Sequence, residues 1–356
     1  MKKLEIMKNG IKERRNGSRP DYRDVAAVLL FIFLLPYIVS FFFGNAGSEG
    51  REGEGDNAEG GTEWIKNGEA GPELFEEDIG KAEFIVCNTT AAGTEKMPLE
   101  TYLVSRLPST VNMEYEMEAL KAQAVVLRTE MMRLYYDSVG EEQEGKAPPL
   151  QKGYIYVESN LVKTDGDIYE KCKEAVSSTR GMYLAYEGYP INAPYFAVSA
   201  GATRNGNEVF GSENYKYLKS VVCGRDFTSK DYIHSIRISK DDFLEKMQEL
   251  CPEIVWEEGK DLEEVFSLQR DRAGYVLEIC SEEGMITGEV FRKAFSLNSS
   301  CFEWQEEEGA IIIKSKGVGH GLGFCQYGAN EAAKKGSDYI DILNYFFSEI
   351  VIEKTE

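Results

Sequence analysis

An uninterrupted helical pattern between Met113 and Leu134 constrains the fold of this chain more than any other feature. Its apolar residues alternate at spacings of four and three, which places them on one face of a helix with about 3.6 residues per turn. The apolar positions are Met113, Met117, Leu120, Ala124, Leu127, Met131 and Leu134. No Pro or Gly interrupts the run, and the candidate N-caps just before it are Ser109, Thr110 and Asn112. The sequence therefore predicts a long amphipathic helix that ends near Gly140.

The N-terminal residues predict a membrane anchor. Residues 1–24 carry eight Lys or Arg against four Asp or Glu, and the nineteen residues 25–43 contain no charge. At about 1.5 Å per residue, such a helix nearly spans a hydrocarbon core of ~30 Å. The alternative, a cleaved signal peptide, would have a shorter apolar core and a small-residue cleavage site. The basic flank places residues 1–24 in the cytoplasm, as a tail, and everything after residue 43 outside it.

Composition bounds what the rest of the chain can do. Residues 44–80 are rich in Gly and Glu, which predicts a flexible linker, and residues 81–356 form the expected folded domain. The net charge of −21 argues against nucleic acid as a partner. Only two histidines are present, so a multi-histidine metal site is excluded. We expect no cofactor and no bound metal.

The folded part shows helical and strand patterns without regular alternation, which favours a single large α+β domain. Strands are expected at 84–86, near Met97, and at 154–157, 217–222, 236–239, 275–280, 288–291 and 310–315, with a hairpin within 181–202. Shorter helices are expected at 167–178, 241–250, 292–297 and 329–335. Ser337 or Asp338 should cap a last helix, and residues 349–353 should close a sheet.

Two stretches carry a family resemblance. The run EALKAQAV at 118–125, followed by Arg128 and Thr129, resembles the EALKAQAVAARTY signature of the stage II sporulation protein D (SpoIID/LytB) family. The glycine-rich run GHGLGFCQYGA at 319–329 resembles the same family's GHGVGMSQYGA. Shorter matches follow in family order at 173–181, 217–221 and 291–302. The resemblance covers roughly residues 84–352, and it places both signatures on one active-site-like surface.

The resemblance implies a membrane-anchored lytic transglycosylase of the engulfment stage of sporulation. Such an enzyme cuts peptidoglycan glycan strands that have been stripped of stem peptides, beside a cell-wall amidase, and leaves 1,6-anhydro ends. The C6 hydroxyl of the sugar is the nucleophile, so one carboxylic acid suffices where hydrolases need two. That acid protonates the leaving oxygen and later accepts the C6 proton.

The chain departs from the family at the catalytic position. Alignment on Tyr102 and Glu118 places the family's catalytic Glu on Thr110, whose hydroxyl cannot donate a proton near neutral pH. Loss of positioned acid–base catalysis typically costs about 10²–10⁴ in rate. Glu114 is the best substitute acid, ahead of Glu116 and Glu118, although acidic residues in a first helical turn commonly serve only the helix dipole.

A second departure concerns the family's YFHSTSGGxT segment, which corresponds to residues 195–203. The family histidine falls on Phe196, or on Ala197 if the match is shifted, and neither can bind metal. Some relatives bind zinc through that histidine and nearby cysteines, and this chain lacks that motif. Ser199 and Thr203 match the segment and are expected at the substrate surface.

The remaining site residues each have two interpretations. Arg128 binds the muramic acid region or orients the acid, or else it pairs with Glu118 or another acid inside the fold. His320 lies among alternating glycines that allow close backbone approach. It contributes to a saccharide groove with Gln326 and Tyr327, or it locks a tight buried loop. The glycine spacing is not that of a dinucleotide-binding fingerprint.

The seven cysteines contain no CxxC pair. Cys325 follows His320 by five residues, which raises the alternative of a Cys/His nucleophile; proximity in sequence alone does not establish one, and the family signature has Ser at this position. Some cysteines could pair outside the cell, among them Cys223, Cys251, Cys280 and Cys301, without a readable connectivity.

Two functions follow from this sequence. The chain is either a divergent lytic transglycosylase with a substitute acid, or a glycan-binding homologue that has lost catalysis and acts as a scaffold or enhancer of a cell-wall amidase. Under both, the expected partners are peptidoglycan glycan strands, the membrane through residues 25–43, and other engulfment proteins. An anchored surface domain of unrelated function is the third, less supported interpretation.

Overall fold

The computed structural model describes most of the chain after residue 82. The described residues are 83–91, 93–140, 153–159, 161–162, 164, 166–254 and 260–355. The predicted tail 1–24, membrane span 25–43 and linker 44–80 lie outside these ranges. Within the ranges, no helix combines the length and apolar character needed to cross a membrane.

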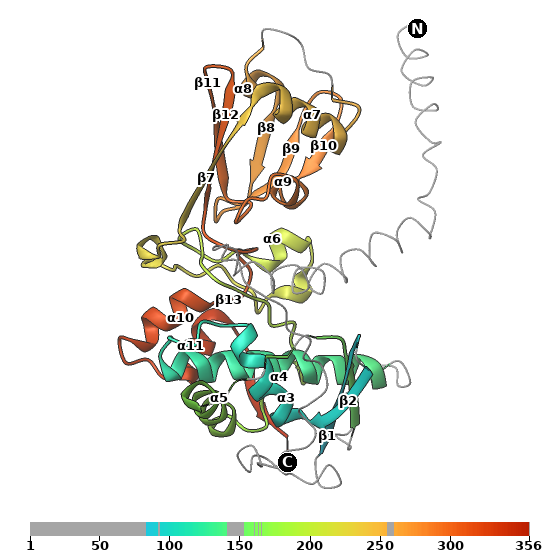
Figure 1. Ribbon diagram of the computed structural model, residues 1–356, viewed down its shortest axis with the longest axis vertical. Helices are drawn as coiled ribbons and strands as arrows, with labels where there is room; N and C mark the ends of the chain where they lie inside the picture. The colour runs from blue at the N-terminus through green and yellow to red at the C-terminus, as the bar shows by residue number, and fades with distance from the viewer. Residues whose placement is uncertain are drawn as a thin grey trace, which may run out of the picture. The chain divides into compact units, whose positions relative to one another are not determined.

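Helix α4 (Met117–Gly140), labelled in Figure 1, contributes side chains to two apolar cores. The predicted apolar face is confirmed, since Leu120 and Leu127 are buried in the first core. The opposite face is also buried, with Ala122 and Val126 in the second core. The helix is thus buried on two sides over its N-terminal half.

The start of α4 differs from the prediction. Glu116 occupies the N-cap position, and its carbonyl accepts the first hydrogen bonds of the helix. The prediction of an N-cap among Ser109, Thr110 and Asn112 is therefore wrong. A cap comes instead from a distant segment, because Asn330 Oδ1 accepts the N–H of Glu116 at 2.9 Å. Sequence next to the helix gives no signal for such a cap.

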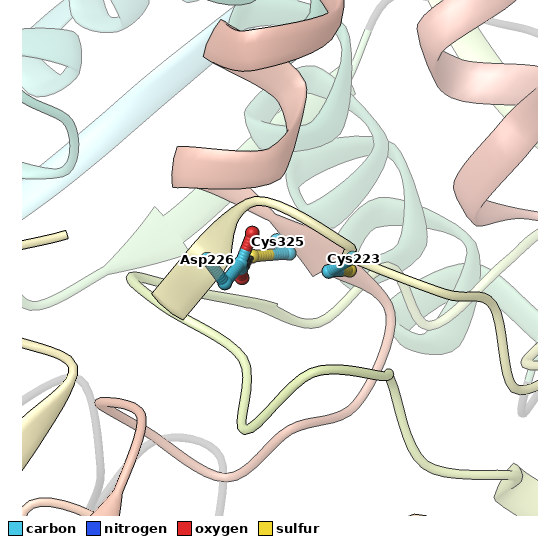
Figure 2. A group of neighbouring side chains, drawn as sticks. All are labelled: Cys223, Asp226 and Cys325. Carbon is cyan, nitrogen blue, oxygen red and sulfur yellow. Dashed lines mark hydrogen bonds between the residues drawn. The ribbon is translucent and has the colours of Figure 1, made fainter. Parts of the chain in front are cut away.

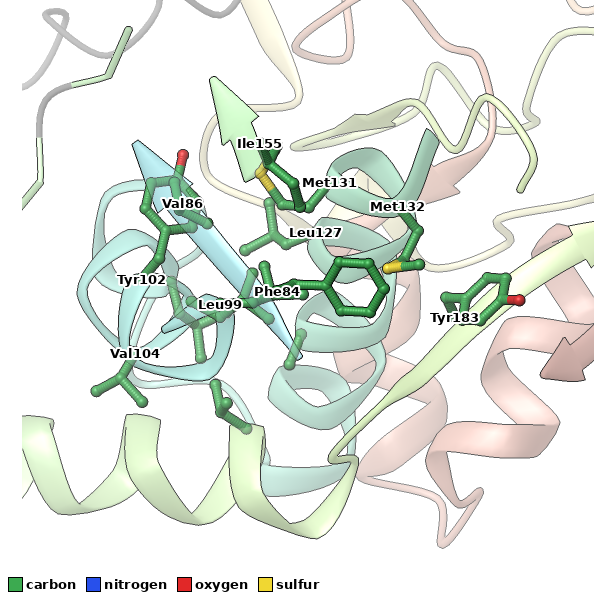
Figure 3. Close-up of a cluster of buried hydrophobic side chains, with 14 of the residues drawn as sticks. Phe84, Val86, Leu99, Tyr102, Val104, Leu127, Met131, Met132, Ile155 and Tyr183 are labelled. Carbon is green, nitrogen blue, oxygen red and sulfur yellow. The ribbon is translucent and has the colours of Figure 1, made fainter. Parts of the chain in front are cut away.

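The first core is covered by a small mixed sheet and two helices. Strand β1 (Phe84–Thr90) pairs antiparallel with β2 (Gly93–Pro98) and parallel with β3 (Gly153–Val157). Helices α3 (Leu99–Arg106) and α5 (Gly166–Ser178) contact one another and pack on α4. Figure 3 shows side chains from the strands, α3 and α4 meeting in this core.

The second core contains the C-terminal elements. Its strands are β4 (Met182–Tyr186), β5 (Tyr189–Pro190), β14 (Val351–Lys354), β6 (Tyr195–Phe196) and β13 (Phe324–Cys325). β4 forms the predicted hairpin with β5 and pairs on its other side with β14, while β6 pairs parallel with β13. Helices α10 (Gln326–Ala333) and α11 (Tyr339–Phe346) pack against α4. Asp338 caps α11, as predicted, by accepting from the N–H of Asp341.

A third core lies within residues 233–316. One sheet has the order β11 (Phe302–Glu307), β12 (Ala310–Lys316), β7 (Ile233–Ser239). The other has the order β10 (Met285–Thr287), β9 (Val276–Cys280), β8 (Ser267–Arg270). The helices of this part are α7 (Lys240–Leu250), α8 (Leu262–Val265) and α9 (Gly288–Ala294). Phe291 stacks on Phe302 and Phe295 at the centre of this core.

The α+β class is confirmed, with two local differences from the predicted strands. Residues 288–291 begin helix α9 instead of forming a strand, because Thr287 accepts from the N–H of Val290 as an N-cap. Residues 217–222 form no regular strand; Val222 makes only an isolated bridge. All seven cysteines are free thiols.

Candidate functional site

The turn before α4 contains Thr110, the residue that the sequence analysis predicts to align with the family's catalytic Glu. Residues Leu107–Ser109 form a 3-10 turn, and the Thr110 hydroxyl donates to the carbonyl of Leu107 at 2.9 Å. Asn112 Oδ1 accepts from the N–H of Glu114 at 2.9 Å and bends the chain into the next turn. The Thr110 side chain is thus engaged within its own turn.

Gln326 joins the two signature stretches. Its Nε2 donates to the carbonyl oxygen of Thr110 at 2.6 Å and to Gln123 Oε1 at 3.0 Å. Gln326 is buried at the N-terminus of α10, so this contact fixes the glycine-rich motif against both the turn and α4. These bonds show that the two stretches are in contact; a shared active-site-like surface stays a prediction.

Two tyrosines lie beside this junction. The hydroxyl of Tyr327 hydrogen-bonds Thr228 Oγ1 at 2.9 Å, and its N–H donates to the carbonyl of Ala197. Burial raises the pKa of Tyr115, and the nearby Cys325 and Tyr327 raise it further. Both tyrosines are half-buried, so each offers part of a ring and a polar group at one place.

The three glutamates near Thr110 have different surroundings. Glu114 and Glu116 are exposed. Glu118 is occupied structurally, since it pairs with Lys121 at 2.7 Å and accepts from the N–H of Tyr339 at 3.0 Å. A carboxyl that must hold its proton at neutral pH is usually kept out of water, an environment the exposed Glu114 lacks.

Arg128 is fully buried and bound within the fold. Its Nε and Nη2 donate to the two oxygens of Glu100 at 2.9 and 2.6 Å. Its remaining N–H groups reach Thr179 Oγ1 and the carbonyls of Val176 and Met182. The guanidinium therefore makes its hydrogen bonds inside the protein, and this geometry favours a structural role for Arg128 over contact with a saccharide.

Ser199 and Thr203 are also buried and engaged. The N–H of Ser199 donates to Asp226 Oδ2 at 2.7 Å, and its hydroxyl accepts from Gly201. Thr203 Oγ1 donates to the carbonyl of Lys219 and accepts from the N–H of Val221. Both residues hold the 199–223 loops together rather than facing solvent.

His320 lies in the glycine-rich loop, six residues before Gln326. Its Nδ1 accepts from the N–H of Leu322 at 3.0 Å, and its ring contacts Phe196. Gly319 and Gly321 adopt φ of +109° and +79°, and a Cβ at Gly319 would lie 2.7 Å from Phe196 Cβ. Burial lowers the pKa of His320 from 6.5 to about 4. His320 is thus a neutral hydrogen-bond acceptor that shapes the loop.

This depressed pKa predicts a histidine contribution to acid sensitivity. The unfolded chain binds a proton at His320 near pH 6.5, whereas the folded chain does so only near pH 4. Acidification from pH 7 to 4 therefore favours unfolding through this residue. In thermal melts across that range, His320→Gln should flatten the loss of melting temperature, and His234→Gln is the control. Equal slopes in the wild type and His320→Gln would contradict this account.

Glu130 is a candidate acid that the sequence interpretation missed. It is half-buried on α4, and burial raises its pKa while Arg106 lowers it. Arg106 also donates to Ser109 Oγ at 3.0 Å, in the turn directly before Thr110. A buried carboxyl with a raised pKa suits a general acid. The sequence feature that could have indicated Glu130 is its replacement of the final Tyr in the family signature EALKAQAVAARTY.

Cys325 does not form a Cys/His pair with His320. Its Sγ donates to Asp226 Oδ2 at 2.9 Å, beside Cys223 (Figure 2). Burial raises the pKa of Cys325 well above its usual value, which disfavours the nucleophilic thiolate. Among the described residues, Cys223, Asp226 and Cys325 are the set whose ligand atoms lie close enough to hold a metal ion.

Comparison with known proteins identifies similar chains. A family model described as "Stage II sporulation protein" (SpoIID) matches residues 88–186. The chain is 32% identical over 279 residues to stage II sporulation protein D of Bacillus amyloliquefaciens, covering 76% of this chain and 78% of that one. It is 31% identical to the Bacillus subtilis (strain 168) protein of the same name, covering 76% and 79%. It is 24% identical to the amidase enhancer of Bacillus subtilis, covering 68% of this chain and 39% of that protein.

Proposed function

This chain belongs to the stage II sporulation protein D family, and we propose that it acts on the cell wall of sporulating cells by binding peptidoglycan glycan strands without cutting them. In this proposal residues 25–43 anchor it in the membrane, and the folded domain acts outside the cytoplasm during engulfment.

The observation that carries the proposal is the bond from Gln326 to Thr110. It keeps the two signature stretches together although the acid that the family's chemistry needs is replaced. Beside the bond, Tyr115 and Tyr327 present ring and hydroxyl groups, which suit the apolar faces and hydroxyls of a sugar. A preserved surface without its acid supports binding over cleavage.

Retention on purified glycan strands tests the binding. The full-length chain in detergent should sediment with strands stripped of stem peptides. Tyr327→Ala should weaken retention by about tenfold, since losing an aromatic contact and a hydrogen bond costs about 1–1.5 kcal/mol. The control is Tyr156→Ala, which removes a tyrosine that is 73% exposed on β3.

Salt adds a second arm to this test. The chain carries −21 charges and the lactyl groups of muramic acid are anionic, so long-range repulsion opposes binding. Retention should therefore hold or rise as salt is increased. No retention at any salt concentration refutes the proposed function. If Tyr327→Ala is retained as well as the wild-type chain, Tyr327 is not part of the binding surface.

Enhancement of a cell-wall amidase is the second candidate function. The likeness to the amidase enhancer of Bacillus subtilis favours it. A glycan-bound, membrane-held domain would raise amidase activity by holding that enzyme at its substrate. Faster release of stem peptides by an amidase in the presence of this chain would support that role.

A further inference from the structure

Cys223, Asp226 and Cys325 form a buried cluster of two thiols and one carboxylate. Cys223 precedes the short 3-10 turn Asp226–Thr228, and Cys325 ends strand β13. Their Sγ and carboxylate atoms lie within 4.8 Å of one another, and all three residues are buried (Figure 2). Residues about 100 positions apart in the sequence are thus brought to one point.

The carboxylate of Asp226 is incompletely satisfied. Its Oδ2 accepts from the N–H of Ser199 at 2.7 Å and from Cys325 Sγ at 2.9 Å. Its Oδ1 is buried and has no hydrogen-bond partner among the described residues. An unpaired buried polar atom typically costs about 1–3 kcal/mol, so such an atom indicates a missing ligand or ion.

We propose that Cys223, Asp226 and Cys325 bind a zinc ion. Two thiolates and one carboxylate are ligands that Zn²⁺ accepts, at about 2.3 Å for sulfur and about 2.0–2.2 Å for oxygen. Tetrahedral geometry then places the ligand atoms about 3.6–3.8 Å apart. The cluster, already within 4.8 Å, needs only small side-chain movements to reach it. The fourth position is open to a water molecule.

The protonation of the cluster suits exchange of protons for metal. Burial raises the pKa of the Cys325 thiol well above its usual value, and this thiol donates a hydrogen bond to Asp226 in the metal-free structure. Binding converts two thiols to thiolates, forms two Zn–S bonds and one Zn–O bond, and releases two protons to solvent. Zinc affinity should therefore rise with pH.

The site is separate from the histidine-based zinc motif of some relatives, because positions 196 and 197 are Phe and Ala. Zinc here would fasten the 223–228 turn to β13, directly before Gln326 and Tyr327. Its role is to hold the surface in which those residues lie. The inference does not depend on glycan binding, since its readout is metal content.

Metal analysis of the full-length chain tests the proposal. Protein purified in detergent, under reducing conditions and without chelators, should contain about one zinc per chain. Cobalt(II) added to the metal-free protein should produce a thiolate-to-metal absorption band. Cys325→Ser and Cys223→Ser should lower zinc affinity more than about 100-fold, beyond the ~10–100-fold typical of outer-shell changes. Cys172→Ser, which removes a buried thiol of α5, is the matched control and should bind normally.

The outcomes are decisive in both directions. The family signature GHGVGMSQYGA has serine at the position of Cys325, so we expect Cys325→Ser to fold. The cobalt spectrum of the wild-type protein tests metal binding without relying on any variant. Absence of zinc and of the cobalt band in fully reduced protein overturns the proposal. So does zinc binding that survives both cysteine substitutions. A Cys223–Cys325 disulfide in protein isolated without reductant would also overturn it and assign the pair to redox chemistry.

Discussion

Thr110→Glu is expected to raise the rate at which this protein forms 1,6-anhydro ends on glycan strands by about 10²–10⁴-fold, the usual contribution of a positioned acid. The expectation rests on the contact between Gln326 and residue 110: Gln326 binds the backbone carbonyl of Thr110, so a carboxyl placed there would lie where the sequence analysis predicts the family's acid. One acid is enough, because the C6 hydroxyl of the sugar serves as the nucleophile. Mass spectrometry of the released fragments measures the gain.

The control is Thr110→Gln, which has the size of glutamate but no proton to donate. Activity in Thr110→Glu and not in Thr110→Gln would assign the gain to the acid. Anhydro products from the wild-type chain, lost in Glu130→Gln or Glu114→Gln, would instead establish a relocated acid. That result would replace the binding function with a divergent lytic transglycosylase.

Arg128→Met should lower the free energy of unfolding by about 3–5 kcal/mol, the cost of leaving one partner of a buried ion pair unpaired. Glu100 is 7% exposed and would keep a charge with no cation beside it. The carbonyls of Val176 and Met182 would each lose the hydrogen bond that Arg128 donates. Urea unfolding of the full-length chain should show a lower midpoint with an unchanged slope.

A surface pair on the same helix provides the control. Arg133 lies 3.6 Å from Asp137, whose side chain is 64% exposed, and such pairs contribute about 0–1 kcal/mol. Arg133→Met should therefore change stability little. If Arg128→Met costs no more than Arg133→Met, Arg128 is not the structural anchor of α3, α4 and β4, and a ligand-binding role returns to consideration.

The periodic spacing of apolar residues predicted the helices and strands that have a regular pattern along the chain. The spacing from Leu120 to Met131 defined the face of α4 that lies in the first core. It did not reveal that Ala122 and Val126 face a second core, because small and β-branched residues on a helix carry no partner information. The α+β class and most strands followed from the same local patterns.

Long-range contacts account for what the sequence did not predict. The acid that pairs with Arg128 is Glu100, 28 residues upstream, and the cap of α4 is Asn330, 214 residues from Glu116. The proximity of Cys223 and Cys325 depends likewise on the pairing of β13 with β6. Such contacts depend on the completed fold, so a single sequence could suggest the Thr110 junction only through the family resemblance.

The two-sided burial of α4 has a consequence for the order of folding. Residues 84–186 cover one face of this helix. The other face is covered only by elements near the C-terminus, among them α10, α11 and β14. The intervening residues 233–316 have a core of their own. That middle segment can become compact from local contacts, while a newly made chain keeps half of α4 uncovered until its last strand arrives. High sequence separation of this kind slows folding and exposes apolar surface during synthesis, which makes the C-terminal residues 324–354 the step that completes the domain.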